Sequence, residues 1–236
     1  MKHFLFSLFL ACVTFMSAQD INQFDTNGKR HGVWEKTFEN SKIPRYQGQF
    51  NHGKPVGVFK FYEAIGDKPV LIAKREFNKS NNLALVTFYT SKGAVISKGK
   101  MDNKTYVGEW LYYHKDSKQV MSQEFYNDKG ELNGKKKVYY LSGKIAEESN
   151  YVNDKLEGKS VSYSEKGKVL RQESYKNDEF HGLFKNYDNA GNLISEGHYA
   201  NDRKTGVWKF YQNGKLVETK DLSKKPKRKR KFKKKK

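Results

Sequence analysis

The amino-acid sequence predicts an all-β fold, an elongated single-layer antiparallel meander of about eight hairpin repeats followed by a disordered C-terminal tail. Three observations support this prediction. A glycine is followed five residues later by a tyrosine, and the pair returns about every 25 residues. A second, mostly aromatic marker follows at a nearly constant interval, and a turn signal lies between the two markers. The eight copies start at Gly32, Gly57, Ala84, Gly108, Gly134, Gly158, Gly182 and Gly206.

Residues 1–19 have the organisation of a secretory signal peptide. Lys2 precedes an apolar run over residues 4–16, and small residues at 17 and 18 come before polarity returns. The run is shorter than the roughly 20 residues that a membrane-spanning helix needs, and the small residues favour cleavage near Ala18 or Gln19. We therefore expect the chain to be exported to the periplasm, to the outer envelope surface or into the medium.

Cys12 is the only cysteine in the chain, and two interpretations of it stay open. It is either an ordinary member of the apolar run or the lipid-modified cysteine of a bacterial lipoprotein signal, which it loosely resembles after Phe9-Leu10-Ala11. In the first case, cleavage leaves a mature chain with no thiol and no disulfide.

The first strand of each copy alternates in hydrophobicity. In the last copy, Trp208 and Phe210 share one face, while Val207, Lys209 and Tyr211 share the other. Such alternation in aromatic and β-branched residues is typical of strands. Glycine and asparagine between the markers supply the positive φ that tight hairpins require. The second strands end at Phe50, Phe77, Met101, Tyr126, Tyr151, Tyr175, Tyr199 and Leu222.

The repeated residues are interpreted first as structural. Each tyrosine ring is expected to pack over the next unit with its hydroxyl in water. Each anchor glycine is expected to mark a place where a ring or turn approaches too closely for a Cβ. The third copy departs most from the pattern, with Ala84 and Met101 at the two marker positions. One repeat position is occupied by aspartate in four copies, at Asp128, Asp154, Asp178 and Asp202. We interpret these aspartates as turn residues, and the alternative is a row of calcium ligands.

The three tryptophans fall at one offset, two residues after their anchor glycines. Trp34, Trp110 and Trp208 therefore share one face of the predicted sheet. One interpretation is packing between neighbouring strands. The other is a candidate partner-binding surface, on which the rings stack against a glycan or against apolar side chains of a protein.

The C-terminal segment 224–236 is set apart by its charge. Eleven of its thirteen residues are Lys or Arg, and they contribute more than half of the net charge of +20. Such charge density predicts disorder and binding to anionic surfaces, whereas the alternative is a solubilising tail with no partner. The chain thus divides into a signal peptide (1–19), a repeat domain (20–223) and a polybasic tail (224–236). The candidate contact residues of the tail are Lys227, Arg228, Lys229, Arg230, Lys231, Lys233 and Lys234.

The sequence shows no recognisable catalytic or cofactor motif. The six histidines have no metal-ligand spacing with one another or with a cysteine, and neither a Gly-x-Ser-x-Gly elbow nor a P-loop is present. We therefore expect no enzymatic activity, no cofactor and no bound metal.

The repeated segments resemble the MORN repeat, in particular its shorter bacterial variant. The closest segments are His31-Gly-Val-Trp34, His181-Gly-Leu-Phe184 and Thr205-Gly-Val-Trp-Lys-Phe-Tyr211, and the resemblance covers about residues 24–222. It implies an elongated sheet used as a platform, and it implies no catalytic residue. Bacterial proteins with such repeats are often labelled antitoxins, and eukaryotic relatives are described as membrane or protein-binding scaffolds.

These features predict a non-enzymatic, exported repeat scaffold that binds a protein partner in the envelope, with its basic tail on an anionic surface. Two alternatives are a glycan-binding or nucleic-acid-binding protein, with nucleic acid the less expected ligand, and an exported antitoxin-like protein. In the glycan or nucleic-acid alternative, the repeated rings stack on the ligand and the tail draws polyanions to the sheet.

Overall fold

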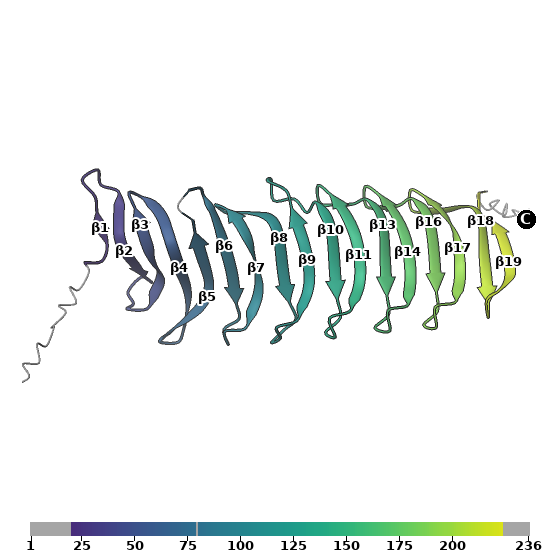
Figure 1. Cartoon of the computed structure of the whole chain (residues 1–236), viewed down its shortest axis with the longest axis horizontal. Coiled ribbons are helices and arrows are strands. Elements are labelled where there is room, and N and C mark those ends of the chain that lie inside the picture. The colour runs from purple at the N-terminus through teal and green to yellow at the C-terminus, as the bar shows by residue number, and fades with distance from the viewer. Residues whose placement is uncertain (1–19, 79, 224–236) are drawn as a thin grey trace, which may run out of the picture.

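The computed structural model describes residues 20–78 and 80–223, which form one open antiparallel sheet of 19 strands in meander order. The described part contains no helix, and none of it could therefore cross a membrane as one. Figure 1 shows a long single layer with the first and last strands at opposite ends. The all-β meander prediction is thus confirmed. The strands are β1 (Gln23–Phe24), β2 (Arg30–Thr37), β3 (Pro44–Asn51), β4 (Lys54–Ile65), β5 (Lys68–Phe77), β6 (Leu83–Tyr89), β7 (Val95–Asp102), β8 (Thr105–Tyr113), β9 (Val120–Tyr126), β10 (Gly134–Tyr139), β11 (Ile145–Val152), β12 (Lys155–Leu156), β13 (Gly158–Tyr163), β14 (Val169–Lys176), β15 (Glu179–Phe180), β16 (Gly182–Tyr187), β17 (Leu193–Ala200), β18 (Arg203–Gln212) and β19 (Lys215–Asp221).

Two kinds of connection alternate along the sheet. Turns within a hairpin lie at the lower edge in Figure 1, here called the hairpin edge, and connections between hairpins lie at the upper edge, here called the junction edge. At the hairpin edge, Gly93 and Gly143 have φ of 85° and 81°, and Asn213 has φ of 53°. The predicted turn chemistry is confirmed, because these positions adopt the left-handed backbone of tight turns.

Every full hairpin carries one β-bulge near its turn. In the β6–β7 pair, Phe88 lies opposite Ser97 and Tyr89 lies opposite Val95, so Ile96 is an extra residue in the second strand. The same register shift occurs at the equivalent place in all eight hairpins. A bulge leaves its extra residue unpaired and increases the local twist. The extra residues are Arg45, Ile72, Ile96, Met121, Ala146, Leu170, Ile194 and Val217.

The anchor glycines lie in a second irregularity of the sheet, at the junctions between hairpins. Between β7 and β8, Gly99 pairs with Trp110 and Lys100 pairs with Val107, which leaves Gly108 and Glu109 unpaired. Gly108 has φ of 64°, and a Cβ there would meet nothing within 4 Å. The expectation of a close ring or turn at the anchor is therefore wrong at this position. Glycine is needed because the chain bulges through the left-handed region.

The junction edge of the C-terminal half is tied by a ladder of aspartates. Asp178 Oδ1 accepts a hydrogen bond from the Leu156 amide at 2.7 Å, and the Asp178 amide donates to the Leu156 carbonyl at 3.0 Å. Asp154 and Asp202 make the same reciprocal pairs one repeat earlier and later. The turn interpretation was right for these three, although the partner lies 22 residues upstream in the preceding unit.

Asp128 does not join this ladder. The connection from β9 to β10 is instead closed by Asn127, whose Oδ1 accepts from the amides of Lys129 and Glu131, both at 3.0 Å. The shared repeat position of four aspartates is therefore a shared structure in only three of them. Among the described residues, no group of His, Cys, Asp or Glu is arranged to hold a metal ion.

Candidate protein-binding face

The tryptophan side of the sheet, here called the tryptophan face, buries two of the three candidate rings. Trp110 and Trp208 are both 0% exposed. Tyr106 stacks on Trp110 with 3.9 Å between ring centroids, and Lys204 Nζ lies 4.0 Å from the Trp208 ring. A fully covered ring cannot stack on a glycan or a partner. For Trp110 and Trp208 the packing interpretation is therefore correct, and the partner-binding interpretation is corrected.

Each buried ring lies against a glycine of the preceding strand, and the missing side chain of that glycine makes the burial possible. A Cβ at Gly99 would overlap the Trp110 ring, and one at Gly197 would overlap the Trp208 ring. Gly48 stands in the same relation to Phe59 in β4. The indole N–H groups of Trp110 and Trp208 donate to the carbonyls of Lys100 and His198, at 2.9 and 3.2 Å. Sequence reasoning missed these glycines, although each stands two residues before the second marker of its unit.

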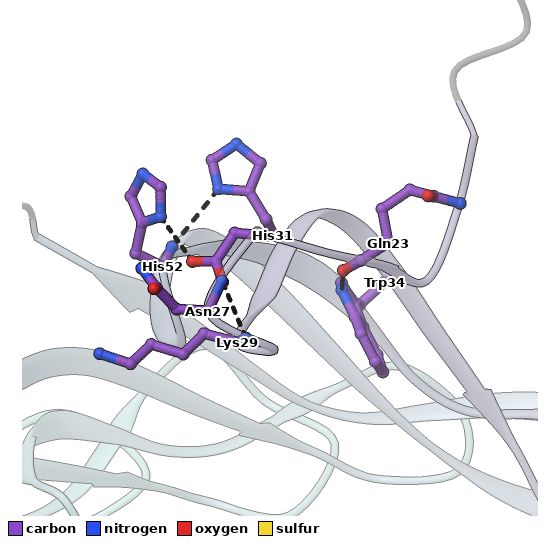
Figure 2. Close-up of polar contacts among 7 residues, drawn as sticks. Gln23, Asn27, Lys29, His31, Trp34 and His52 are labelled. Atoms are coloured by element: carbon purple, nitrogen blue, oxygen red, sulfur yellow. Dashed lines mark hydrogen bonds and ion pairs between the residues drawn. The ribbon is translucent and has the colours of Figure 1, made fainter.

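Trp34 is half-buried and belongs to a closure of the N-terminal end of the sheet. Its indole N–H donates to the Gln23 carbonyl at 3.0 Å, as Figure 2 shows, and the Phe24 ring meets it edge-on at 5.1 Å. At the same end, a hydrogen bond from His52 to Asp25 at 2.6 Å lowers the pKa of the Asp25 carboxyl. Trp34 thus holds the first residues of the domain in place.

Buried polar groups replace the aromatic core in the middle units. Glu124 accepts a hydrogen bond from the Tyr126 hydroxyl at 2.7 Å and pairs with Lys136 at 2.9 Å. Burial, with the nearby carboxylate, raises the pKa of Tyr126. Tyr175 and Glu173 repeat the arrangement two units later, at 3.0 Å. These carboxylates and hydroxyls of the tryptophan face therefore satisfy one another within the sheet.

The opposite side, here called the lysine face, carries the tyrosines of the repeat. Tyr62 donates its hydroxyl to Gln47 Oε1 and Tyr211 donates to Glu196 Oε1, both at 2.8 Å. Tyr139 reaches Gln123 in the same way. At these three positions the hydroxyl, which was expected to reach water, donates to a Gln or Glu of the preceding hairpin. Each ring is thereby fixed in orientation while staying half-exposed.

The bulge residues project beside these tyrosines. Ile96 is 46% exposed, Met121 40% and Ile194 39%. Because alternation along β7, β9 and β17 places them with Lys98, Gln123 and Glu196, they share the lysine face. Together they make one apolar stripe across the sheet, consisting of Tyr62, Tyr89, Tyr113, Tyr139, Tyr163, Tyr187, Tyr211, Ile72, Ile96, Met121, Ala146, Leu170, Ile194 and Val217.

A row of cations runs beside the apolar stripe in the N-terminal half. Lys60 lies directly opposite Lys74, and Thr87 separates Lys74 from Lys98. Like charges directly opposite each other in a sheet are destabilising. In the C-terminal half the row is neutralised, since Lys185 and Lys209 both pair with Glu196, at 3.4 and 3.7 Å. In the N-terminal half Lys74 pairs with Glu76 at 3.5 Å, and the ion pairs of the described residues include neither Lys60 nor Lys98, so this part of the stripe is apolar with a partly cationic border.

A groove of about 800 Å³ lies at the junction edge, over the bases of β3 to β5. His31, Phe50 and Phe77 line it together with several asparagines. Asn78 donates to Asn81 Oδ1 at 2.6 Å and accepts the amide of Asn81 at 2.8 Å. These amide groups close their own loop, which makes the groove a weaker candidate than the apolar stripe.

The remaining sequence-predicted features lie outside the described residues. They are the signal peptide at 1–19 and the polybasic tail at 224–236.

The hairpins, bulges and exposed stripe define a β-hairpin repeat protein with a surface suited to binding. A sequence model of the MORN repeat variant matches three consecutive segments, 132–153, 156–177 and 180–201. These segments are MORN-variant repeats, as the sequence resemblance predicted. They start at Leu132, Leu156 and Phe180, the three residues that the aspartate ladder holds. Hairpins with the same bulge continue on both sides of them, from β2 to β19.

Comparisons with whole proteins add no further relationship. No curated protein sequence matches the chain. One solved structure that matches is described as a mutant of S. aureus TarM in complex with fondaparinux, alpha-GlcNAc-glycerol and UDP. The identity is 14% and the TM-score 0.27, over 64% of this chain and 21% of that one. This chain thus spans about a fifth of the length of that protein.

Proposed function

We propose that this protein is an exported, non-enzymatic scaffold that binds a protein partner through the apolar stripe of its lysine face. The observation that carries the proposal is the contrast between the two faces. Trp110 and Trp208 are fully covered on one side, whereas Ile96, Met121 and Ile194 stay exposed beside the repeat tyrosines on the other. Exposed apolar surface in a continuous row is typical of a protein-binding site.

The charges beside the stripe indicate the chemistry of the partner. Lys60, Lys74 and Lys98 border the N-terminal part, where Lys60 lies opposite Lys74 across the β4–β5 pair and Glu76 offsets only the charge of Lys74. An acidic side chain on a partner would pair with Lys60 or Lys98 and so complement the remaining positive charge of this border. The partner segment should therefore carry apolar side chains flanked by Asp or Glu.

Affinity capture from an envelope extract tests this face. The chain from residue 20 is compared with its double variant Ile96→Glu and Met121→Glu, because two carboxylates on the stripe should repel an acidic apolar segment. A specific protein should bind the unmodified chain and be lost with the double variant. The matched control is Leu141→Glu, since Leu141 is 61% exposed but lies in a hairpin turn. Equal capture by all three forms would refute the assignment.

The second part of the proposal is that the polybasic tail holds the scaffold on an anionic surface. Eleven basic residues, each worth about 1 kcal/mol near such a surface, would suffice for stable attachment. The chain from residue 20 and a form ending at Ser223 are mixed with phosphatidylglycerol vesicles at low and high salt. Binding should require both the tail and low salt. Equal binding by the shortened form would contradict the tether.

A further inference from the structure

The two edge strands of the sheet differ in whether other residues cover them. At the N-terminal end, residues before β2 cover its outer edge, because the Asn22 amide donates to the Val33 carbonyl at 2.8 Å and Asn22 Oδ1 accepts the Glu35 amide at 2.9 Å. At the other end, all seven residues of β19 are exposed, including Leu216 at 53% and Val217 at 59%. An exposed edge strand presents free backbone donors and acceptors to another strand.

The register of β18 with β19 shows which backbone groups point outward. The Leu222 amide donates to the Gly206 carbonyl at 2.8 Å, and Trp208 and Phe210 lie opposite Lys220 and Glu218. Hydrogen-bonded and non-hydrogen-bonded pairs alternate in an antiparallel ladder. Lys220 and Glu218 therefore bond inward to β18. Thr219 and Asp221 direct their amide and carbonyl groups away from the sheet.

The sequence of this edge is complementary to itself when read in the opposite direction. If two copies of β19 pair about a two-fold axis through Thr219, each Thr219 lies opposite the other. Glu218 then lies opposite the partner's Lys220 on both sides of the axis. Val217 would lie opposite the partner's Asp221. Opposite charges and Thr–Thr pairs are favourable cross-strand neighbours. The outward-facing residues are also those that this register requires for hydrogen bonding.

We infer that β19 pairs with β19 of a second copy of this chain, so that two sheets join end to end into one continuous sheet. The pairing is antiparallel and centred on Thr219, and the lysine face continues from one copy to the next. The covered N-terminal edge restricts the assembly to a dimer, because no second open strand remains for a filament among the described residues. Only a few residues pair, so the dimer is weak and depends on concentration.

Sedimentation of the chain from residue 20, at about 0.15 M salt, tests the dimer. A form ending at Ser223 is run in parallel, because the eleven basic residues beyond it repel their copies. At least one of the two forms should show a reversible monomer–dimer equilibrium. Two monomeric forms up to the highest soluble concentration would overturn the inference.

Charge reversal identifies the register. Glu218→Lys and Lys220→Glu should each weaken the dimer about tenfold, because each sets like charges opposite one another. The double swap should restore it, since Lys and Glu then exchange places in the same pairs. Lys155→Glu and Glu165→Lys, at exposed positions away from β19, are the matched controls for net charge. Single variants that dimerise normally, or a double swap as weak as the single variants, would refute this register.

Discussion

At the scale of single residues, the tryptophan face is governed by the sizes of neighbouring pairs. Gly99 faces Trp110 and Gly197 faces Trp208, whereas Ser149 and Ser160 fill the equivalent positions in the middle of the sheet. The rings of Trp110 and Trp208 are fully buried because the preceding strand has no side chain opposite them. In a sheet with a single layer, this pairing takes the place of a conventional core.

Substitution of one such glycine tests the size rule. Gly99→Ala should destabilise the protein by about 1–3 kcal/mol, because the new methyl group overlaps the buried Trp110 ring. In a Trp110→Val background the same substitution should cost much less, which a double-mutant cycle by chemical denaturation measures.

Ser149 provides the control at the equivalent position in β11. Its Oγ is buried without a hydrogen-bond partner, so Ser149→Ala should be neutral or stabilising by up to about 1 kcal/mol. Equal losses at Gly99 and Ser149 would contradict the size rule.

At the scale of elements, each hairpin is joined to the next by side chains as well as by strands. Tyrosine hydroxyls reach back about 15 residues to Gln or Glu, and the aspartate ladder reaches back 22 residues to a backbone amide. Both devices cross the unit boundary. A lone hairpin is marginal in water, and these bonds supply part of what it lacks.

The aspartate ladder predicts different effects for two substitutions at Asp178. Asp178→Gly keeps the φ of 71° accessible but removes the acceptor of the Leu156 amide, and it should cost about 1 kcal/mol. Asp178→Asn keeps both the acceptor and tolerance of the left-handed region, so its effect should be small. Hydrogen exchange at the Leu156 amide reports the bond directly. Unchanged protection in Asp178→Gly would show that the ladder contributes nothing.

At the scale of the whole molecule, stability accumulates along the array because every unit contacts only its neighbours. Many of these contacts involve neutral tyrosines. Burial, together with nearby carboxylates, raises the pKa of Tyr126 and Tyr175 above its ordinary value of 10.0. A raised pKa means that the folded state favours the protonated hydroxyl more than the unfolded state does.

The pH dependence follows from this sign. The stabilisation by Tyr126 and Tyr175 is fully present below pH 10 and is lost as the pH rises above it. The midpoint of thermal unfolding should therefore fall from about pH 9 to about pH 11, and the fall should be smaller in the double variant Tyr126→Phe and Tyr175→Phe. An equal fall in both proteins would assign the alkaline loss to other groups.

The sequence predicts the repeat, its hairpins and its turns because these depend on local spacing and on residues that accept positive φ. It does not predict which face is free. Tryptophan is a residue type that is common in binding surfaces, so the sequence leaves Trp110 and Trp208 as candidates. Only the glycines of the neighbouring strand show that both rings are covered. Ile96 and Met121 look like ordinary strand residues until the register places them in bulges.

The sequence alone therefore determined the all-β meander, the period of its units and the family of its repeats, since periodicity and turn residues are properties of neighbours along the chain. Only the tertiary structure decided that the tryptophans are packing residues, that the apolar stripe lies on the opposite face, and that one end of the sheet is closed while β19 is open. Those outcomes depend on which side chains of adjacent strands meet, and strand register sets that across separations of 10 to 22 residues.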